Sequence, residues 1–209
     1  HSIQRHGLLS SEALLDLFEI TNHQRELLLA NHRPECVEIQ HPVHGLATLR
    51  DQKPMRESQL ARCLSDGMTP PDWYRILNRR TFFWTTEERL RGLLQARAYR
   101  GRQHCVLTID SAQLLQEYVD AVTLSPYNSG CTLYNAPMRG RETFLPMNEF
   151  NYEAWRERGR QPRKVIVELA VDYAVQNIVR FTDSAKLMHR GEVLETFFER
   201  QHASINNCG

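Results

Sequence analysis

Two β-prone runs that lead directly into capped helices constrain the fold of this chain more than any other feature. The aromatic and β-branched run at 81–85 is followed by Glu88, and the run at 105–109 is followed by Asp110 and Gln113. Both junctions have the spacing of an N-terminal capping box, which indicates a strand that turns straight into a helix. Units of this kind predict a mixture of helices and strands, so we expect an α+β fold.

Hydrophobic periodicity and helix-boundary residues place the other elements. Helix is expected over 10–30, capped by Ser10 and interrupted at 21–22, and over 56–78, broken at 66–67 and restarted by two prolines. Further strands are expected at 46–50, 121–125, 143–146 and 165–171. A C-terminal helix is expected over 184–202, with an inward face formed by Leu187, Leu194, Phe197 and Phe198.

Length and composition predict one folded domain over residues 1–209. Of the 209 residues, 41% are hydrophobic and 24% are charged, which provides a core and excludes a wholly disordered chain. No apolar run approaches the roughly 18 residues that cross a bilayer, and no secretory leader opens the chain. The five cysteines form no CxxC pair, which favours a reducing compartment, so we expect a cytoplasmic protein.

Arginine dominates the basic residues. The chain has 26 basic and 25 acidic residues, a net charge of +1, and its lysines are Lys53, Lys164 and Lys186, so 23 of the basic residues are arginines. The planar guanidinium group suits bidentate contacts with phosphate, and arginines cluster at 75–102 and 139–163. The clusters indicate either a phosphate-binding face or a GC-rich genome that encodes arginine wherever a surface cation is needed.

Glu168 is the most informative single residue. In the strand expected at 165–171, alternation puts Glu168 on one face and its neighbours Val167 and Leu169 on the other. A carboxylate held rigidly at a cleft can bond a sugar hydroxyl and stabilise a developing oxocarbenium ion. The competing interpretation is an amphipathic strand whose polar face lies in water.

Three other features could carry chemistry. The guanidinium group of Arg50 could hold a diphosphate or a carboxylate, or be an ordinary surface cation. The aromatic run 82–84 could stack on a nicotinamide or a base, or belong to the core. A metal-dependent hydrolase could use His32, Cys36, His41 and His44, but their spacing matches no common zinc pattern, so we expect no metal. The sequence contains no P-loop, GxGxxG, HExxH or GxSxG motif.

Taken in order, five segments resemble the ADP-ribosyltransferase fold. They are 3–10 (IQRHGLLS), 50–55 (RDQKPM), 81–86 (TFFWTT), 104–110 (HCVLTID) and 167–178, which begins VELAV. The resemblance is closest to the DarT-type enzymes, which modify DNA bases with NAD, and more distant to the tRNA 2′-phosphotransferases. In these families the first segment follows a strand with an NAD-binding histidine, which here is expected before His1. The strings RDQKPM and SPYNSG are also similar to a bacterial family of unknown function.

The resemblance implies two small packed sheets, mixed or antiparallel and flanked by helices, that form a cleft for NAD. It implies Glu168 and Arg50 as catalytic residues, with Arg50 near the diphosphate and Glu168 bonded to the ribose. As cofactor-binding residues it implies Gly7, Leu8, Phe83, Trp84 and Thr85. Loops between the later strands offer three residues for the acceptor, each of which is otherwise a turn former or a surface charge: Tyr127, Asn128 and Arg141.

The implied activity is NAD-dependent transfer of ADP-ribose to a nucleic-acid base, without a metal or a membrane. The implied biological role is that of a bacterial toxin or phage-defence factor, which an antitoxin could partner. An acceptor base would have to be single-stranded or flipped to reach the cleft. Other acceptors stay open, namely a protein side chain, a tRNA 2′-phosphate or water. A non-catalytic arginine-rich module that binds nucleic acid is a further alternative.

Overall fold

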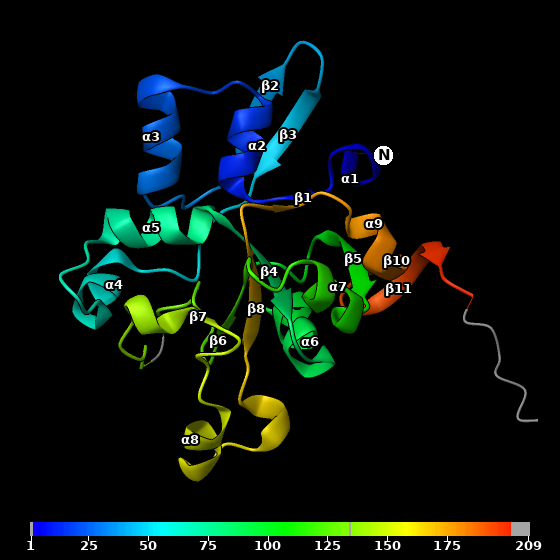
Figure 1. Ribbon diagram of the computed structural model, residues 1–209. Coiled ribbons are helices and arrows are strands. Elements are labelled where there is room, and N and C mark those ends of the chain that lie inside the picture. The colour runs from blue at the N-terminus through cyan, green and yellow to red at the C-terminus, as the bar shows by residue number, and fades with distance from the viewer. Residues whose placement is uncertain (1, 134, 202–209) are drawn as a thin grey trace, which may run out of the picture.

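The computed structural model describes residues 2–133 and 135–201. In its N-terminal part, two helices pack against a hairpin (Figure 1). The elements of this part are α1 (Ser2–His6), β1 (Leu8–Leu9), α2 (Ser11–Leu17), α3 (Asn22–Ala30), β2 (Val37–His41) and β3 (Gly45–Leu49). One core cluster holds α2, α3 and the hairpin together, and it is formed by Leu15, Phe18, Leu29, Ile39 and Leu49.

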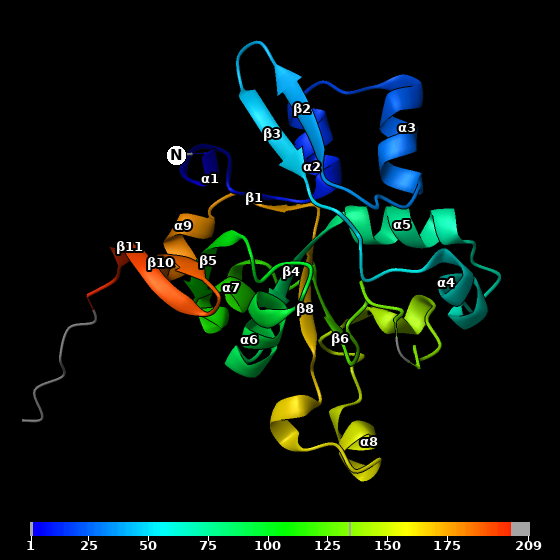
Figure 2. The same cartoon turned by 180° about the vertical axis from the view of Figure 1, so that it is seen from behind.

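A four-stranded antiparallel sheet lies in the middle of the molecule. Its strand order is β4 (Arg80–Trp84), β8 (Glu168–Asp172), β6 (Val122–Ser125) and β7 (Leu145–Pro146). Two helices, α4 (Glu57–Cys63) and α5 (Pro70–Asn78), contribute to the core cluster on one face of β8, which includes Ala170. Both views place α5 between the N-terminal part and this sheet (Figures 1 and 2).

The opposite face of β8 belongs to a second cluster, which includes Leu169 and Val171. That cluster also draws on α7 (Ser111–Glu117) and α9 (Ile178–Phe181). The strand therefore has a buried surface on both sides, and the alternation expected from the sequence is confirmed within β8. The strand begins at Glu168 rather than at the expected residue 165, because a 3-10 turn occupies Pro162–Lys164 and Val165 ends it in a helical conformation. Burial on both faces also explains why the whole run 168–171 is buried.

The last part of the chain forms a second antiparallel sheet, of order β11-β10-β5. Its strands are β5 (Gln103–Ile109), β10 (Thr182–His189) and β11 (Glu192–Glu199). The remaining elements are α6 (Glu87–Gln95), α8 (Tyr152–Glu157) and β9 (Ala174–Val175), which pairs with β1, and 3-10 turns occupy Arg141–Thr143 and Pro162–Lys164. Small antiparallel sheets flanked by helices confirm the α+β class. No helix within residues 2–133 and 135–201 has both the length and the apolar character to span a membrane.

Most local predictions are confirmed. The Ser10 side chain accepts from the backbone N–H of Ala13 at the start of α2, and Asp110 caps α7 in the same way. The helix expected over 56–78 is split into α4 and α5 at the expected break, with Pro70 at the first turn of α5. These signals are short-range, so they survive whatever the tertiary contacts are.

Three expectations are wrong. The segment 184–202 is not a helix but the hairpin β10–β11, and Leu194, Phe197 and Phe198 are exposed on it rather than inward. The sequence predicts a single strand in this region, at 46–50, but a second strand, β2, precedes it and pairs with β3. The capping box expected between Thr85, the last residue of the run 81–85, and Glu88 does not form, because the N-cap of α6 is Thr86 and it has no side-chain cap bond.

Candidate active site

Glu168 begins β8, the strand of the central sheet that has a partner on each side. The antiparallel register sets Glu168 opposite Trp84 of β4 and opposite Ser125 of β6. Glu168 is 4% exposed. An amphipathic strand with its polar face in water is therefore the wrong interpretation of this position. A buried carboxyl group in the middle of a sheet must instead be held by partners.

Ser129 supplies both hydrogen bonds to the Glu168 carboxylate. Its backbone N–H donates over 3.1 Å and its hydroxyl over 2.6 Å, and both bonds end on Oε2. The other carboxylate oxygen, Oε1, accepts no hydrogen bond from the described residues. It is not among the fully buried polar atoms that lack a partner. One oxygen is thus fixed in place, and the other has the capacity to accept a hydrogen bond from a bound hydroxyl group.

Burial raises the pKa of Glu168 to about 7, and the two hydrogen bonds from Ser129 and the positive charge of Arg139 oppose that rise. A carboxyl group with a pKa near neutrality can both accept and donate a proton under physiological conditions. The helix-capping carboxylates behave in the opposite way. Hydrogen bonds from Thr69 and Gln113 lower the pKa values of Asp72 and Asp110, respectively. The pKa of Glu168 is therefore shifted in the opposite direction from the pKa values of the two capping carboxylates.

Arg139 fixes the loop that carries Ser129. The residue is 1% exposed, and its Nη1 donates to the carbonyl of Ser129 over 2.8 Å. Its Nη2 donates to the carbonyl of Asn128 over 3.3 Å and to that of Cys131. A shift of this loop would leave a buried guanidinium and buried carbonyls without partners, at a high cost in free energy. The donor groups around the carboxylate are therefore preorganised.

The same loop contacts the chain segment that follows Arg50. The N–H of Thr132 donates to the carbonyl of Pro54 over 2.9 Å, and the Thr132 hydroxyl accepts from the N–H of Arg56 over 2.7 Å. Arg50 is exposed, with its guanidinium carbon 4.8 Å from the centre of the Tyr99 ring. Within the described part of the chain, no hydrogen bond or ion pair joins Arg50 to Glu168. The structure brings their segments together through the loop but does not bring the two side chains into contact.

Asp51 anchors the backbone next to Arg50, and sequence analysis did not single it out. The Asp51 carboxylate is buried and accepts from the Tyr99 hydroxyl over 3.1 Å and from the Cys36 thiol over 3.3 Å. Arg102 lies 3.5 Å from it. Nothing in the local sequence distinguishes this aspartate from a surface one, because these partners come from two other segments, one at Cys36 and one at 99–102.

The cofactor-binding candidates at the N-terminus lie in a tight backbone junction. Leu8 pairs with Val175, which joins β1 to β9. Gly7 has a φ of +77°, and a Cβ added to it would lie 2.5 Å from both the Cα of Gln176 and the carbonyl oxygen of Val175. The structure therefore gives Gly7 a packing role that requires glycine. Whether NAD also lies there is a separate prediction.

The candidates at the end of β4 are closer to the carboxylate. Trp84 is directly opposite Glu168 in the sheet and is half-buried. Thr85 donates its hydroxyl to the carbonyl of Ile166 over 2.7 Å, which fastens the end of β4 to the chain just before β8. Phe83 packs against the core cluster that contains Leu169. Of these three residues, Trp84 and Thr85 lie where they could border a ligand at Glu168.

Two of the three acceptor candidates lie on the Ser129 loop. The Tyr127 ring meets Trp155 edge-on at 5.5 Å, and the guanidinium of Arg160 lies over both rings, 5.6 and 4.8 Å from their centres. Asn128 is exposed, with its carbonyl bound by Arg139. Arg141 is an exposed residue of the next 3-10 turn, and its backbone N–H donates to Asp66. The residues that position the carboxylate, Ser129 and Arg139, are those that sequence analysis missed.

One cavity adjoins the other side of this loop. It has a volume of about 390 Å³, and Glu168 is not among its lining residues, which are Gln59, Arg62, Cys63, Leu133, Asn135, Ala136 and Met138. Two of the lining residues connect the cavity to Arg139. Met138 precedes Arg139 in the chain, and the carbonyl of Cys63 accepts a hydrogen bond from the N–H of Arg139 over 2.7 Å. Its size is in the range of small-molecule pockets, about 300–1,000 Å³.

The four residues of the metal-site alternative do not gather into one place. His32 stacks on Tyr74 with ring centres 6.1 Å apart, and Cys36 donates to Asp51. His41, the last residue of β2, stacks on His44 of the following turn with ring centres 4.7 Å apart. Within the described ranges, no group of three or more His, Cys, Asp or Glu residues is arranged to hold a metal ion.

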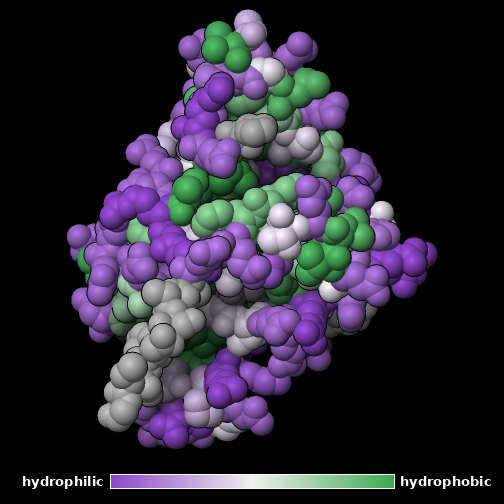
Figure 3. All heavy atoms as spheres, turned by 90° about the vertical axis from the view of Figure 1, so that its right-hand side faces the viewer, coloured by the Kyte–Doolittle hydropathy of each residue, from purple (hydrophilic) through white to green (hydrophobic). Residues whose placement is uncertain are grey.

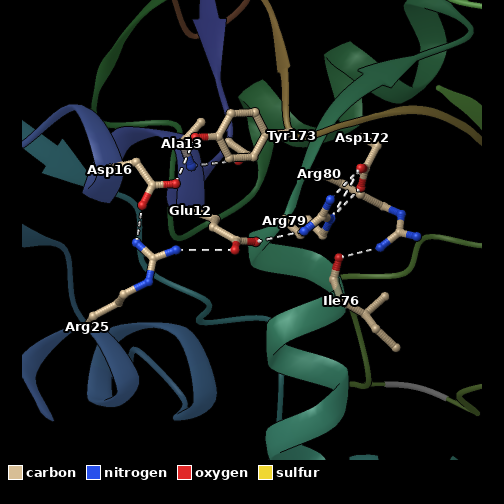
Figure 4. A network of polar contacts seen from close by, with 10 residues as sticks. Glu12, Ala13, Asp16, Arg25, Ile76, Arg79, Arg80, Asp172 and Tyr173 are labelled. Atoms are coloured by element: carbon tan, nitrogen blue, oxygen red, sulfur yellow. Dashed lines mark hydrogen bonds and ion pairs between the residues drawn. The ribbon is translucent and has the colours of Figure 1, made fainter. Parts of the chain in front are cut away.

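An ion-pair network holds the opposite end of β8. Arg79 binds Asp172 over 2.9 Å and approaches Glu12 of α2 to 4.0 Å. Arg25 of α3 in turn binds Glu12 over 3.2 Å and Asp16 over 2.6 Å (Figure 4). Pairs that are exposed or half-buried, like these, contribute little free energy each, about 0–1 kcal/mol. As a connected set they link the N-terminal helices α2 and α3 to the strand that carries Glu168.

Comparison with known proteins gives a family but no activity. No curated protein and no solved structure matches the chain. One family model, DUF7002, a family of unknown function, matches residues 1–182. The match includes Glu168, Ser129 and Arg139 and ends at the first residue of β10. The chain belongs to this DUF7002 family of unknown function.

Proposed function

We propose that the protein is an NAD-dependent ADP-ribosyltransferase that modifies nucleic acid, with Glu168 as its catalytic carboxylate. The observation that carries the proposal is the state of Glu168. It is buried in the central strand, bonded through one oxygen only, and has a pKa of about 7. The order of the five segments that resemble the ADP-ribosyltransferase fold supports the same assignment.

The chemistry needs a carboxylate with these properties. NAD supplies the ADP-ribosyl group, because its nicotinamide can leave with the electron pair of the glycosidic bond. The free Oε1 of Glu168 can accept a hydrogen bond from a ribose hydroxyl, and its negative charge stabilises the positive charge that develops on the ribose. When the acceptor forms its bond to the ribose carbon, the carboxylate can take the proton that the acceptor loses.

The hydrogen bonds of Ser129 have a defined part in this mechanism. They hold Oε2 in one position, so the orientation of the carboxylate is set before a substrate binds. The Arg139 contacts hold Ser129 in turn, which makes Arg139 a positioning residue rather than a catalytic one. Arg50 is proposed to bind the diphosphate, since its exposed guanidinium is free of ion pairs within the described residues.

The acceptor is proposed to be a base in DNA or RNA. Tyr127, on the loop next to Ser129, forms an aromatic and cationic cluster with Trp155 of α8 and with Arg160, and such clusters suit unpaired bases and their phosphates. A cytoplasmic toxin or defence factor with an antitoxin partner fits an enzyme that modifies nucleic acid. A protein acceptor is the alternative that the experiment below separates.

The test is transfer of label from NAD that is labelled in its adenylate part. The protein is incubated with single-stranded DNA, duplex DNA, RNA or lysate protein, and label is measured on each. The control variant is Glu168→Gln, which keeps an oxygen acceptor for both Ser129 donors but cannot take a proton. We expect transfer to a nucleic acid and a loss of about 10²- to 10⁴-fold in the variant.

Two outcomes would overturn the proposal. Equal transfer by the Glu168→Gln variant would remove Glu168 from the chemistry. Salt-dependent binding of nucleic acid with no consumption of NAD in any arm would favour the non-catalytic binding module. Label on protein alone would keep the fold and the carboxylate but replace the acceptor.

A further inference from the structure

A second cavity lies away from Glu168, between the end of α6 and the turn of the β10–β11 hairpin. Its volume is about 450 Å³, and its lining residues are Gln95, Arg100 and Arg190. The register of β10 against β5 explains how residues so far apart in sequence meet. His189 pairs with Gln103, so Arg190 lies beside the turn that contains Arg100. Figure 3 shows the side of the molecule on which the hairpin lies, where apolar residues form a band across the middle and hydrophilic residues surround it.

The positive charge at this cavity is not neutralised from within the protein. In the described residues, the side chains of Arg97, Arg100 and Arg190 form no ion pair or hydrogen bond. The sequence has no Asp or Glu between Glu88 and Asp110, although it has five arginines there. The neighbouring arginines of this stretch differ, because Arg91 binds Glu87 and Arg102 approaches Asp51. Unpaired guanidinium groups that converge on a cavity attract an anion.

The hairpin turn holds Arg190 in an uncommon conformation. Arg190 and Gly191 both have positive φ, 54° and 90°, so they form the two central positions of a tight primed turn. Asn, Asp and Gly are the residues that favour such a turn, and a long side chain there is disfavoured by about 1 kcal/mol. The conformation of the turn therefore does not explain why an arginine occupies position 190. A role in binding at the cavity, which Arg190 lines, does explain it.

We infer that this cavity binds the phosphodiester backbone of a nucleic-acid strand. Guanidinium groups bind phosphate bidentately, and two of them face a space much larger than one phosphate group, with Arg97 in the same turn. A strand with repeated charges fits such a site better than a single small anion. The inference deepens the proposed function. Only the statement that the bound strand is also the acceptor of ADP-ribose rests on that function.

Binding without NAD separates this inference from the proposed function. Fluorescence anisotropy of a labelled single-stranded oligodeoxynucleotide is measured with the full chain over a range of salt concentrations. We expect the double variant Arg100→Ala/Arg190→Ala to bind about tenfold more weakly at low salt. Its slope of log affinity against log salt should fall by about 1.4, which is about 0.7 for each lost contact with a single strand.

The matched control is Arg75→Ala/Arg180→Ala, which removes the same charge. Those two arginines are exposed and already paired, Arg75 with Glu26 and Arg180 with Glu117. The control should change affinity by less than about twofold, as expected for cations that are already neutralised. Equal losses in both double variants would reduce the effect to net charge and overturn the site. Wild-type affinity in Arg100→Ala/Arg190→Ala would do the same, as would competition by inorganic pyrophosphate at equal concentration of phosphate groups.

Discussion

At the scale of single residues, the buried carboxyl group of Glu168 makes stability depend on pH in an unusual direction. Its pKa is raised from 4.5 to about 7, so the folded protein holds this proton more tightly than the unfolded chain. The stability contributed by the protonated group is complete below pH 4.5 and is lost as the pH rises through 7. Most carboxylates that are paired in folded proteins act in the reverse sense.

The free energy of unfolding of the Glu168→Gln variant should therefore increase relative to that of the wild type as the pH rises. The amide does not titrate, and it can keep an acceptor for the Ser129 donors. Between pH 4 and pH 8 the difference in unfolding free energy should move in favour of the variant by about 3 kcal/mol, which is 1.36 kcal/mol per pKa unit. Urea unfolding of both proteins across this range measures it. Parallel profiles for the two proteins would show that the carboxyl group does not titrate as described.

The site could be predicted only in part, for reasons that lie with particular residues. Glu168 stood out because a single charge interrupts an apolar strand, which is a local pattern. Ser129 is 39 residues away from Glu168 in sequence, and Arg139 is one arginine among 23. No local signal distinguishes the arginine that is buried under a loop from those that lie on the surface, because tertiary contacts decide it.

At the scale of elements, the chain shows which signals are local and which are not. The caps of α2 and α7 are formed by residues that lie next to their helices, so sequence was sufficient. The apolar residues of the hairpin β10–β11 have helix-like spacing, so the sequence predicts a helix where the structure has two strands. The chain reverses between the two strands at Arg190-Gly191, where both residues have positive φ. A positive φ at the first of these positions is not predicted by an arginine, because Asn, Asp and Gly are the residues that favour it.

A pair of glycine substitutions tests the junction between β1 and β9. Gly7→Ala and Gly45→Ala both place alanine at a positive φ, +77° and +73°, which costs about 1 kcal/mol in each case. At Gly45 nothing lies within 4 Å of the new Cβ, whereas at Gly7 two backbone atoms lie at 2.5 Å. We expect Gly7→Ala to lose at least about 2 kcal/mol more than Gly45→Ala, as measured by thermal or urea unfolding.

Similar losses in the two variants would mean that the backbone at Gln176 can move away at little cost. The comparison of stabilities is also needed to interpret the activity of Gly7→Ala. Loss of activity in Gly7→Ala would not by itself identify Gly7 as a cofactor-binding residue, because the substitution disturbs the contact between the N-terminal segment and β9.

At the scale of the whole molecule, we expect the protection of backbone amides from hydrogen exchange to decrease from the central sheet to the C-terminal edge strand. Strand β8 has partners on both sides and a core cluster on each face. Strand β11 has a single partner, and all eight of its residues are exposed. Backbone amides exchange through local opening, and opening is easiest where few buried contacts are lost. The described edge strand should therefore open long before the centre does.

Hydrogen exchange followed by mass spectrometry should show this order. Peptides from 168–172 should exchange only through global unfolding, and peptides from 192–199 should exchange several orders of magnitude faster. Val193, Leu194, Phe197 and Phe198 are each 44–54% exposed on β11, so the edge is also where another chain could cover apolar surface. Protection of 192–199 that equals that of 168–172 would contradict a bare edge. If such protection rose with protein concentration, β11 would be covered by a second copy of the chain, and the gradient would apply only to the monomer.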